Sequence, residues 1–179
     1  MSGPVAFVER SLTSADRTRS VETYPDRDRF SWSINGESFR SSLEVATFRV
    51  GELFLPNGES YSGSSLGDLP EGNGKYMWLN GTVYEGGWRL GARHGIGKLQ
   101  WPSGAFYEGE FSGGYMHGTG TYISSSKLTY RGRFRFNLKH GLGHQVYPNG
   151  DILEGSWMQG TPEGPGKYTW VNGNVYVGN

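Results

Sequence analysis

The 179-residue sequence contains no cysteine, which excludes a disulfide framework, a cysteine-ligated zinc site and a thiol nucleophile. It also has no run approaching the roughly 18 apolar residues of a membrane span. The apolar stretch before Glu9 is too short for the core of a signal peptide. An excess of one charge is absent as well, because 17 basic residues balance 17 acidic ones. This balance argues against a dedicated nucleic-acid-binding protein, and the missing cysteines fit a reducing compartment.

Glycine and aromatic residues are abundant instead, with 30 glycines, 11 tyrosines, 9 phenylalanines and 6 tryptophans. Glycine favours turns and aromatic side chains favour strands, whereas neither favours a helix. The two kinds are interleaved throughout the sequence after about residue 45. We therefore predict an all-β fold with many tight turns.

Three landmarks recur with a period of 23 residues and without insertion or deletion. The first is the motif Tyr-x-Gly, the second is Gly-x-Gly, and the third is a turn dipeptide that is usually Asn-Gly. Landmarks that share one register indicate tandem repeats, and repeats of this length are typical of a stacked array of small units. Tyr-x-Gly begins at Tyr61, Tyr84, Tyr107, Tyr130 and Tyr176, with Leu153 in the fifth position; Gly-x-Gly begins at Gly72, Gly95, Gly118, Gly141 and Gly164; the dipeptide begins at Asn57, Asn80, Ser103, Ser126, Asn149 and Asn172.

Each repeat is predicted to be a β-hairpin. Tyr107, Gly109 and Phe111 alternate with acidic residues, and this period of two is typical of a strand with one apolar face. Asn-Gly supplies the two residues with positive φ that a type I′ turn needs, so we expect it to link the second strand of one hairpin to the first strand of the next. The predicted fold class is therefore an elongated, single-layer antiparallel sheet of tandem 23-residue hairpins.

The repeated aromatic residues are expected to pack between neighbouring repeats, because one hairpin cannot bury a core by itself. The glycines of Tyr-x-Gly are expected beneath these rings, where a side chain would block packing or strand curvature. We assign a structural role to Tyr61, Gly63, Tyr84, Gly86, Trp88, Tyr107, Gly109, Phe111, Tyr130, Gly132, Phe134, Gly155 and Trp157.

Catalytic and metal-binding motifs find no support in the sequence. In no repeat is Gly-x-Gly followed by the third glycine of a dinucleotide-binding loop. The string from Gly63 to Gly67 matches a nucleophile elbow but lacks the preceding buried strand and the following helix. His94, His117 and His140 recur two strands apart, roughly 10 Å, which is too far for one metal ion. We therefore expect no catalytic residue, no metal and no cofactor in this chain.

The fourth repeat carries an unusual cluster of positive charge. Arg131 stands where neighbouring repeats have Glu108 and Glu154, and residues 127–139 contain five cations without a carboxylate. One interpretation is a solvated face that the neighbouring glutamates balance. The other is a contact with anionic lipid headgroups, worth about 1 kcal/mol per cation near a membrane surface. The candidate lipid-binding residues are Lys127, Arg131, Arg133, Arg135 and Lys139.

The combination of Tyr-x-Gly-x-(Trp/Phe), His-Gly-x-Gly and a closing Asn-Gly resembles the MORN repeat. More narrowly, the segments LPNGESYSG, WPSGAFYEGEFSGGYMHGTGTY and GTPEGPGKYTWVNGNVYVGN resemble the N-terminal MORN region of plant phosphatidylinositol 4-phosphate 5-kinases. We expect residues 1–45 to be disordered and residues 46–179 to form a MORN-repeat domain. Its expected units are a partial unit at 46–60, full units at 61–83, 84–106, 107–129, 130–152 and 153–175, and a truncated unit at 176–179.

This resemblance implies a non-catalytic module. The family continues into a C-terminal lipid kinase domain that uses ATP and magnesium; no part of that domain is recognisable here, so we expect an N-terminal piece of a longer protein. The implied role is peripheral association with the cytoplasmic side of the plasma membrane through anionic phospholipids, and regulation of a kinase domain in the same polypeptide. The alternative is a protein-interaction scaffold without lipid binding. An open aromatic layer at Tyr176 would also permit end-to-end self-association, and neither interpretation includes a nucleic acid.

Overall fold

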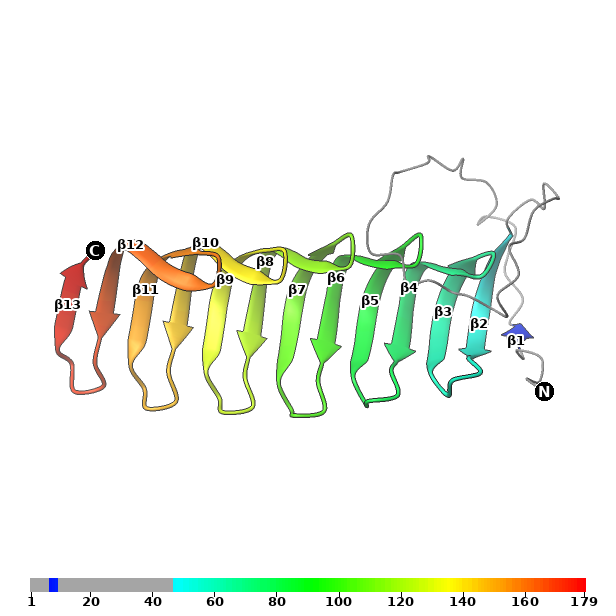
Figure 1. The fold of residues 1–179 in the computed structure, drawn as a ribbon, viewed down its shortest axis with the longest axis horizontal. Coiled ribbons are helices and arrows are strands. Elements are labelled where there is room, and N and C mark those ends of the chain that lie inside the picture. The colour runs from blue at the N-terminus through cyan, green and yellow to red at the C-terminus, as the bar shows by residue number, and fades with distance from the viewer. Residues whose placement is uncertain (1–6, 10–46) are drawn as a thin grey trace.

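A computed structural model describes residues 7–9 and 47–179 of the chain. These residues form one antiparallel sheet of 13 strands, in which neighbours in the sheet are neighbours in the sequence, and they contain no helix. The strands lie side by side along the long axis of the molecule (Figure 1), which confirms the predicted single-layer array of hairpins. The strands are β1 (Phe7–Glu9), β2 (Phe48–Phe54), β3 (Ser60–Leu66), β4 (Leu69–Met77), β5 (Val83–Arg89), β6 (Ala92–Gln100), β7 (Phe106–Ser112), β8 (Tyr115–Ile123), β9 (Thr129–Arg135), β10 (Leu138–Val146), β11 (Ile152–Met158), β12 (Thr161–Thr169) and β13 (Val175–Gly178).

Strand β1 was not predicted. It pairs in antiparallel fashion with β2, and it falls inside the segment 1–45 that was predicted to be disordered. The remainder of that segment, residues 1–6 and 10–45, lies outside the described residues. The repeat array itself begins at β2 and runs to β13.

The Asn-Gly turns join one repeat to the next, as predicted, but they are not type I′ turns. In the turn between β4 and β5, Gly81 has a φ of 82° whereas Asn80 stays out of the positive-φ region. The Trp78 N–H donates to the Thr82 carbonyl, and the Gly81 N–H donates to the Trp78 carbonyl, both at 2.9 Å. This is a three-residue loop, a type I turn followed by one left-handed residue, so it needs only one glycine. The prediction was wrong because Asn-Gly fits both kinds of turn.

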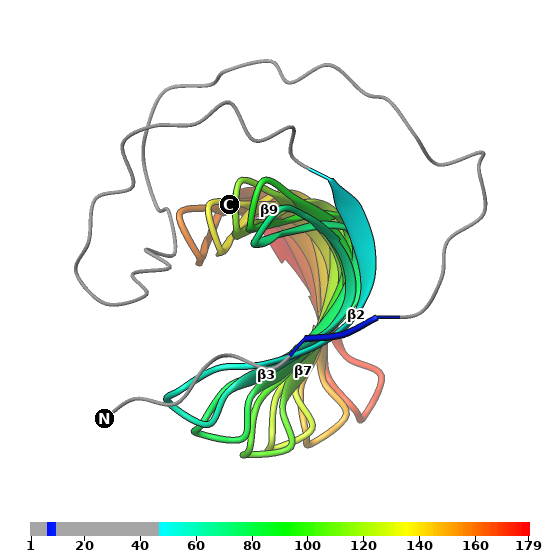
Figure 2. The same cartoon turned by 90° about the vertical axis from the view of Figure 1, so that its right-hand side faces the viewer.

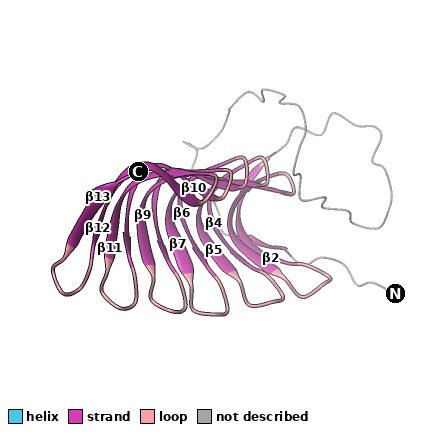
Figure 3. Ribbon diagram, turned by 60° about the vertical axis from the view of Figure 1, so that its left-hand side comes forward, coloured by secondary structure: helices cyan, strands magenta, loops and turns pink. Residues whose placement is uncertain are grey.

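Two-residue turns close the other end of each hairpin. At Leu90-Gly91 the φ angles are 49° and 78°, and at Phe136-Asn137 they are 50° and 68°. Two successive left-handed residues define the type I′ turn, whose twist matches that of the flanking strands. The two families of turns therefore occupy opposite long edges of the sheet (Figure 3).

A row of glycines crosses the sheet at mid-strand. Gly86 pairs with Gly97 inside a hairpin and with Gly74 of the preceding hairpin. A Cβ atom added to Gly97 would lie 2.4 Å from the Tyr84 hydroxyl, so the tyrosine ring covers this glycine. Every strand from β2 to β13 contributes one member to the row: Gly51, Gly63, Gly74, Gly86, Gly97, Gly109, Gly120, Gly132, Gly143, Gly155, Gly166 and Gly178.

A β-bulge sits beside this row in the second strand of each full repeat. In the second repeat, β6 places the three residues between Arg93 and Gly97 opposite Gly87 alone. Gly95, in the middle of the bulge, has a φ of 69°, which a residue with a side chain rarely adopts. Bulges bend the strand that carries them and increase its twist. Seen along its long axis, the sheet is accordingly curled into an arc (Figure 2).

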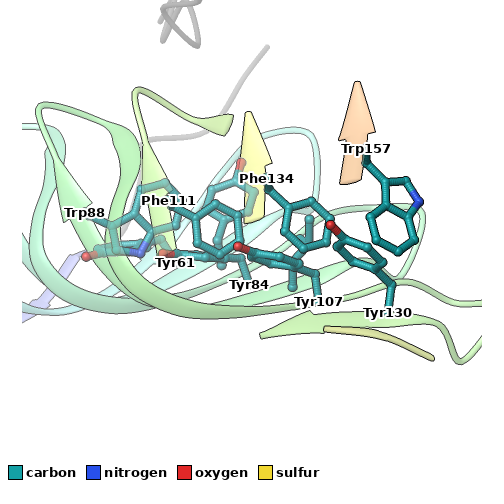
Figure 4. Close-up of a cluster of buried hydrophobic side chains, with 10 residues drawn as sticks. Tyr61, Tyr84, Trp88, Tyr107, Phe111, Tyr130, Phe134 and Trp157 are labelled. Carbon is teal, nitrogen blue, oxygen red and sulfur yellow. The ribbon is translucent and has the colours of Figure 1, made fainter. Parts of the chain in front are cut away.

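The core is a row of rings on the inner face of the bend (Figure 4). Tyr84 is 0% exposed, and its ring packs edge-on against Trp88 of its own strand at 5.1 Å and against Phe111 of the next repeat at 5.0 Å. Phe111 contacts Tyr107 at 5.1 Å, and the same alternation continues to Trp157. Each aromatic pair adds about 0.5–1.5 kcal/mol beyond the burial of its area.

The tyrosine hydroxyls explain why this position holds tyrosine rather than phenylalanine. The Tyr84 hydroxyl donates to the Gly87 carbonyl at 2.8 Å, and the Tyr107 hydroxyl donates to the Glu110 carbonyl at 2.9 Å. These carbonyls lie where the bulge interrupts the ladder of hydrogen bonds between the strands. The tyrosine hydroxyl therefore gives a hydrogen-bond donor to a carbonyl at this interruption. Burial raises the pKa of the Tyr84 and Tyr107 hydroxyls well above the usual range, so both remain donors.

Candidate functional site

The outer face of the sheet carries a ladder of alternating charges. Lys75 stands opposite Glu85 on the next strand with a separation of 3.9 Å, and Lys98 stands opposite Glu108 at 4.0 Å. All four side chains are about half exposed or more, so each pair stabilises the sheet by at most about 1 kcal/mol. The ladder nevertheless leaves the first repeats close to electrical neutrality on this face.

The fourth repeat interrupts the ladder. Arg131 has Thr121 and His144 as its cross-strand neighbours, so no carboxylate faces it from either side. The next acidic residue, Glu154, contacts His144 at 3.5 Å and Lys167 at 3.3 Å. The Lys167 ammonium, and then His144, lower the pKa of Glu154, which therefore remains a carboxylate. Its negative charge is paired with those two residues and not with Arg131.

Three of the five candidate cations share one surface. Arg131, Arg133 and Arg135 are exposed on the outer face of β9, because they alternate with the buried Tyr130 and Phe134. Among the described residues, none of the three arginines belongs to an ion pair. The fold therefore presents three uncompensated guanidinium groups along a single strand.

Lys127 lies in the turn that precedes β9. It is exposed and has a φ of 70°, the conformation that glycine adopts in the equivalent turn before β5. The Ser124 N–H donates to the Leu128 carbonyl at 2.8 Å, so the loop closes as it does in the other repeats. Lys127 thus adds a cation at the turn edge of the strand that carries the arginines.

The structure separates Lys139 from the arginines. Its side chain is half-buried on the inner face, where Nζ lies 4.9 Å from the centre of the Tyr130 ring and donates to Gln145 Oε1. Burial lowers the pKa of Lys139. The equivalent residue of the third repeat is Met116, which packs against the core, and this apolar counterpart was the signal that Lys139 faces inward.

Sequence reasoning did not identify Leu142 as part of this surface. Leu142 is 72% exposed and is the middle residue of Gly-x-Gly in the fourth repeat, beside the arginine strand. Its counterpart Ile96 is also exposed, at 67%, but its cross-strand partner is Glu110. An apolar side chain next to several cations is an arrangement suited to the boundary between lipid headgroups and acyl chains.

A second feature lies on the inner face. A groove of about 500 Å³ opens between the two edges of the sheet, with Trp101, Met116, Tyr122 and Leu138 in its wall and Lys139 at its side. Most of this lining is apolar, which suits a protein segment better than a charged headgroup.

In the part of the chain that the structure describes, no three histidine, aspartate or glutamate side chains gather into a possible metal site. The same residues include no helix with the length and hydropathy needed to cross a bilayer. His94, His117 and His140 lie at the bulges of successive repeats.

Fold and core together define a hairpin-array protein, in which similar units of 23 residues share one sheet and one aromatic row. The MORN repeat matches residues 61–83, 84–106, 107–129, 130–152 and 154–175, and the chain belongs to the MORN-repeat family. Four of these five ranges coincide with the units read from the sequence, and the fifth starts one residue later than the expected 153.

Curated relatives are plant lipid kinases. Phosphatidylinositol 4-phosphate 5-kinase 9 of Arabidopsis thaliana is 61% identical over 79 residues, which is 44% of this chain and 10% of the relative. Phosphatidylinositol 4-phosphate 5-kinase 1 of Oryza sativa subsp. japonica is 54% identical over 41 residues, 21% of this chain and 5% of the relative. The chain thus aligns with a tenth or less of the length of these relatives. Among solved structures, the TCP domain of Drosophila melanogaster SAS-4 gives a TM-score of 0.42 at 16% identity, covering 82% of this chain and 98% of that one.

Proposed function

We propose that this chain is a non-catalytic module that binds anionic phospholipid surfaces through the outer face of its fourth repeat. The observation that carries the proposal is the row of Arg131, Arg133 and Arg135, which have no ion-pair partner among the described residues. Lys127 extends the positive charge to the turn, and Leu142 adds an exposed apolar side chain beside it. Each cation near an anionic membrane surface contributes about 1 kcal/mol.

The relatives suggest which kind of longer polypeptide contains this module. Those relatives are phosphatidylinositol 4-phosphate 5-kinases, and the chain matches only a small part of each. We propose that the module holds such a kinase domain at the plasma membrane and regulates it from the same polypeptide. ATP and magnesium would serve that kinase domain and not the repeats.

The proposal is tested by reversing the three arginines. Substitution of Arg131, Arg133 and Arg135 by glutamate is expected to reduce binding to phosphatidate-containing vesicles by at least about a hundredfold, as the loss of three cations predicts. Co-sedimentation with vesicles measures the effect. The matched control reverses Lys75, Lys98 and Lys167, which have ion-pair partners, and changes the net charge equally. Equal binding by the arginine variant and the wild type would refute the lipid contact.

The inner groove favours a second candidate function, a scaffold that binds a protein segment. Its apolar wall, formed by residues such as Trp101, Met116 and Tyr122, would bury a complementary apolar segment. Salt distinguishes the two functions: lipid binding should fade between about 50 and about 300 mM NaCl, whereas an apolar contact should persist. Retention of a protein partner at high salt by the triple-arginine variant would support the scaffold.

A further inference from the structure

The β-bulge of the third repeat holds a carboxylate. Glu110 Oε1 accepts the Thr119 N–H at 2.8 Å, across the bulge that β8 forms against β7. The carboxylate lies against Gly118, where an added Cβ atom would be 2.5 Å from Oε2. The bulge therefore presents a backbone N–H to an anionic group, and in this repeat the protein supplies that group itself.

The fourth repeat has the same bulge with the opposite charge beside it. Gly141 has a φ of 63°, against 64° for Gly118, and the register between β9 and β10 shifts at the same place. Leu142 takes the position of Thr119, and Arg133 takes the position of Glu110. The Thr119 N–H points toward the first strand of its hairpin, so the Leu142 N–H points toward β9, where Arg133 lies.

We infer that the bulge of the fourth repeat binds a phosphate group, with the Leu142 N–H and the Arg133 guanidinium as its donors. The Arg133 side chain already lies over the bulge, because its Cδ is 3.5 Å from the place where a Gly141 Cβ would be. A phosphate oxygen would occupy the position that the Glu110 carboxylate oxygen has in the third repeat. Guanidinium binds phosphate through two parallel hydrogen bonds, and a backbone N–H adds a donor of fixed direction.

The other repeats lack this combination. The position of Arg133 is held by Ser64, Gly87 and Ser156 in the first, second and fifth repeats, none of which carries charge. In the fifth repeat, Pro165 moreover replaces the residue whose N–H would donate. The inference rests on the proposed function, because it assigns the phosphate of an anionic headgroup to one place on the arginine surface.

The test uses backbone NMR of the whole chain titrated with inorganic phosphate. The Gly141 and Leu142 amide resonances are expected to shift and saturate. Arg133→Glu supplies the bulge with a carboxylate, as in the third repeat. It should weaken phosphate binding by at least about tenfold, because even one lost charge-assisted hydrogen bond has an effect of this size. The neutral variant Arg133→Ser, which copies the first and fifth repeats, should weaken it less.

A reciprocal variant makes the test independent of damage to the fold. Glu110→Arg removes the carboxylate from the third repeat and should create a new phosphate response at the Thr119 amide. In wild type, Thr119 should not respond, and it serves as the reference resonance. No phosphate response at Leu142 in wild type, or none at Thr119 in Glu110→Arg, would overturn the inference.

Vesicles distinguish a lipid headgroup from free phosphate. If Arg133→Glu abolishes both the phosphate response and binding to phosphatidate vesicles, the bulge holds a headgroup. If the phosphate response is present but wild type ignores vesicles, the bulge is a site for soluble phosphate esters and the lipid function fails. If vesicle binding depends on Arg131 and Arg135 but not on Arg133, the lipid function stands and the bulge does not hold the phosphate of the headgroup.

Discussion

The two glycines of each Gly-x-Gly are required for different physical reasons. Gly95 has a φ of 69° and no atom within 4 Å of an added Cβ, so it supplies a backbone conformation. Gly97 needs no special φ but lies under the Tyr84 ring, where there is no room for a side chain. From the sequence we expected the glycine of Tyr-x-Gly beneath the rings, but the Tyr84 ring lies over Gly97, and a Cβ atom on Gly86 would meet the Gly97 backbone first. The left-handed residue in the bulge could not be predicted either, because nothing in Gly-x-Gly indicates which of the two glycines has a positive φ.

Substituting alanine for Gly97 tests the requirement for space. The added Cβ would be 2.4 Å from the Tyr84 hydroxyl oxygen and 2.6 Å from Cζ, so the ring must move. We expect a loss of about 1–3 kcal/mol of unfolding free energy from overpacking. The control Gly104→Ala has a φ of 83° and no neighbouring atom within 4 Å, so it should cost only about 1 kcal/mol of backbone strain. Urea denaturation of both variants gives the comparison, and equal losses would contradict the close packing of the ring.

Lys127 is a residue whose native conformation favours another amino acid. Its φ of 70° is the one that Gly81 and Gly150 adopt in equivalent turns. Lys127→Gly should therefore raise the unfolding free energy, by up to about 1 kcal/mol. Lys127→Ala, which keeps a Cβ atom, should not, and differential scanning calorimetry separates the two. A Lys127→Gly variant no more stable than Lys127→Ala would show that the turn tolerates a side chain without strain.

At the scale of elements, a buried carboxylate ties two successive inter-repeat turns together. Asp151 accepts the Tyr168 hydroxyl at 2.7 Å and the Val171 N–H at 2.9 Å, and it is 5% exposed. The Tyr168 hydroxyl first, and then the Val171 N–H, lower the pKa of Asp151. The carboxylate in turn raises the pKa of Tyr168 to about 12.

This contact predicts a loss of stability at both ends of the pH range. Because the pKa of Asp151 is lowered on folding, its contribution is complete above the unfolded value of about 3.9 and is lost as pH falls through the folded pKa. Because the pKa of Tyr168 is raised to about 12, its contribution is complete below the unfolded value of about 10 and is lost between about pH 10 and 12. Asp151→Asn and Tyr168→Phe should each have a lower urea midpoint at neutral pH and shallower slopes in these two windows. Curves parallel to that of wild type would refute the contact.

The order in which the strands pair followed directly from the period of 23 residues, because each repeat is one hairpin and each hairpin continues the sheet of the one before it. The faces of the strands were harder to predict. Along β9, Arg131, Arg133 and Arg135 alternate simply with buried residues. Between the arginines and Lys139, the two-residue turn at Phe136-Asn137 reverses the chain and pairs Lys139 with the buried Phe134, so counting by twos from the arginine cluster did not reveal that Lys139 faces inward.

At the scale of the whole molecule, the aromatic row couples the repeats. Phe111 is 3% exposed and contacts Tyr84 of the preceding repeat at 5.0 Å as well as Tyr107 of its own at 5.1 Å. Phe111→Ala should cost about 3–5 kcal/mol and weaken the coupling between the two halves of the array. Urea unfolding followed by hydrogen exchange and mass spectrometry should then show two steps, with the segments before and after β7 unfolding separately.

The matched control for Phe111 lies on the same strand. Phe106 is on the outer face, where its ring centre is 4.7 Å from Lys98 Nζ, and it is only partly buried. Phe106→Ala should cost less and leave one cooperative transition. Two-step unfolding in both variants, or in neither, would show that the aromatic row does not carry the coupling.

The elongated array was predictable from the sequence because its repeats have no insertion. Its curl was not, since curvature accumulates from the fit of each ring over a glycine pair and from each bulge. The pairing of β1 with β2 was also beyond sequence analysis, because Phe7–Glu9 carries no repeat landmark.

The direction of the strands has a mechanical consequence. The strands lie across the long axis (Figure 1), so the hydrogen bonds between them run along it. Tension applied to the two ends of the array would load one ladder of bonds at a time and peel the strands off singly. Tension applied along the strands would load a whole ladder in shear. The array is thus compliant along its length and stiff across it, so that under load it would lengthen one hairpin at a time before its repeats slide past one another.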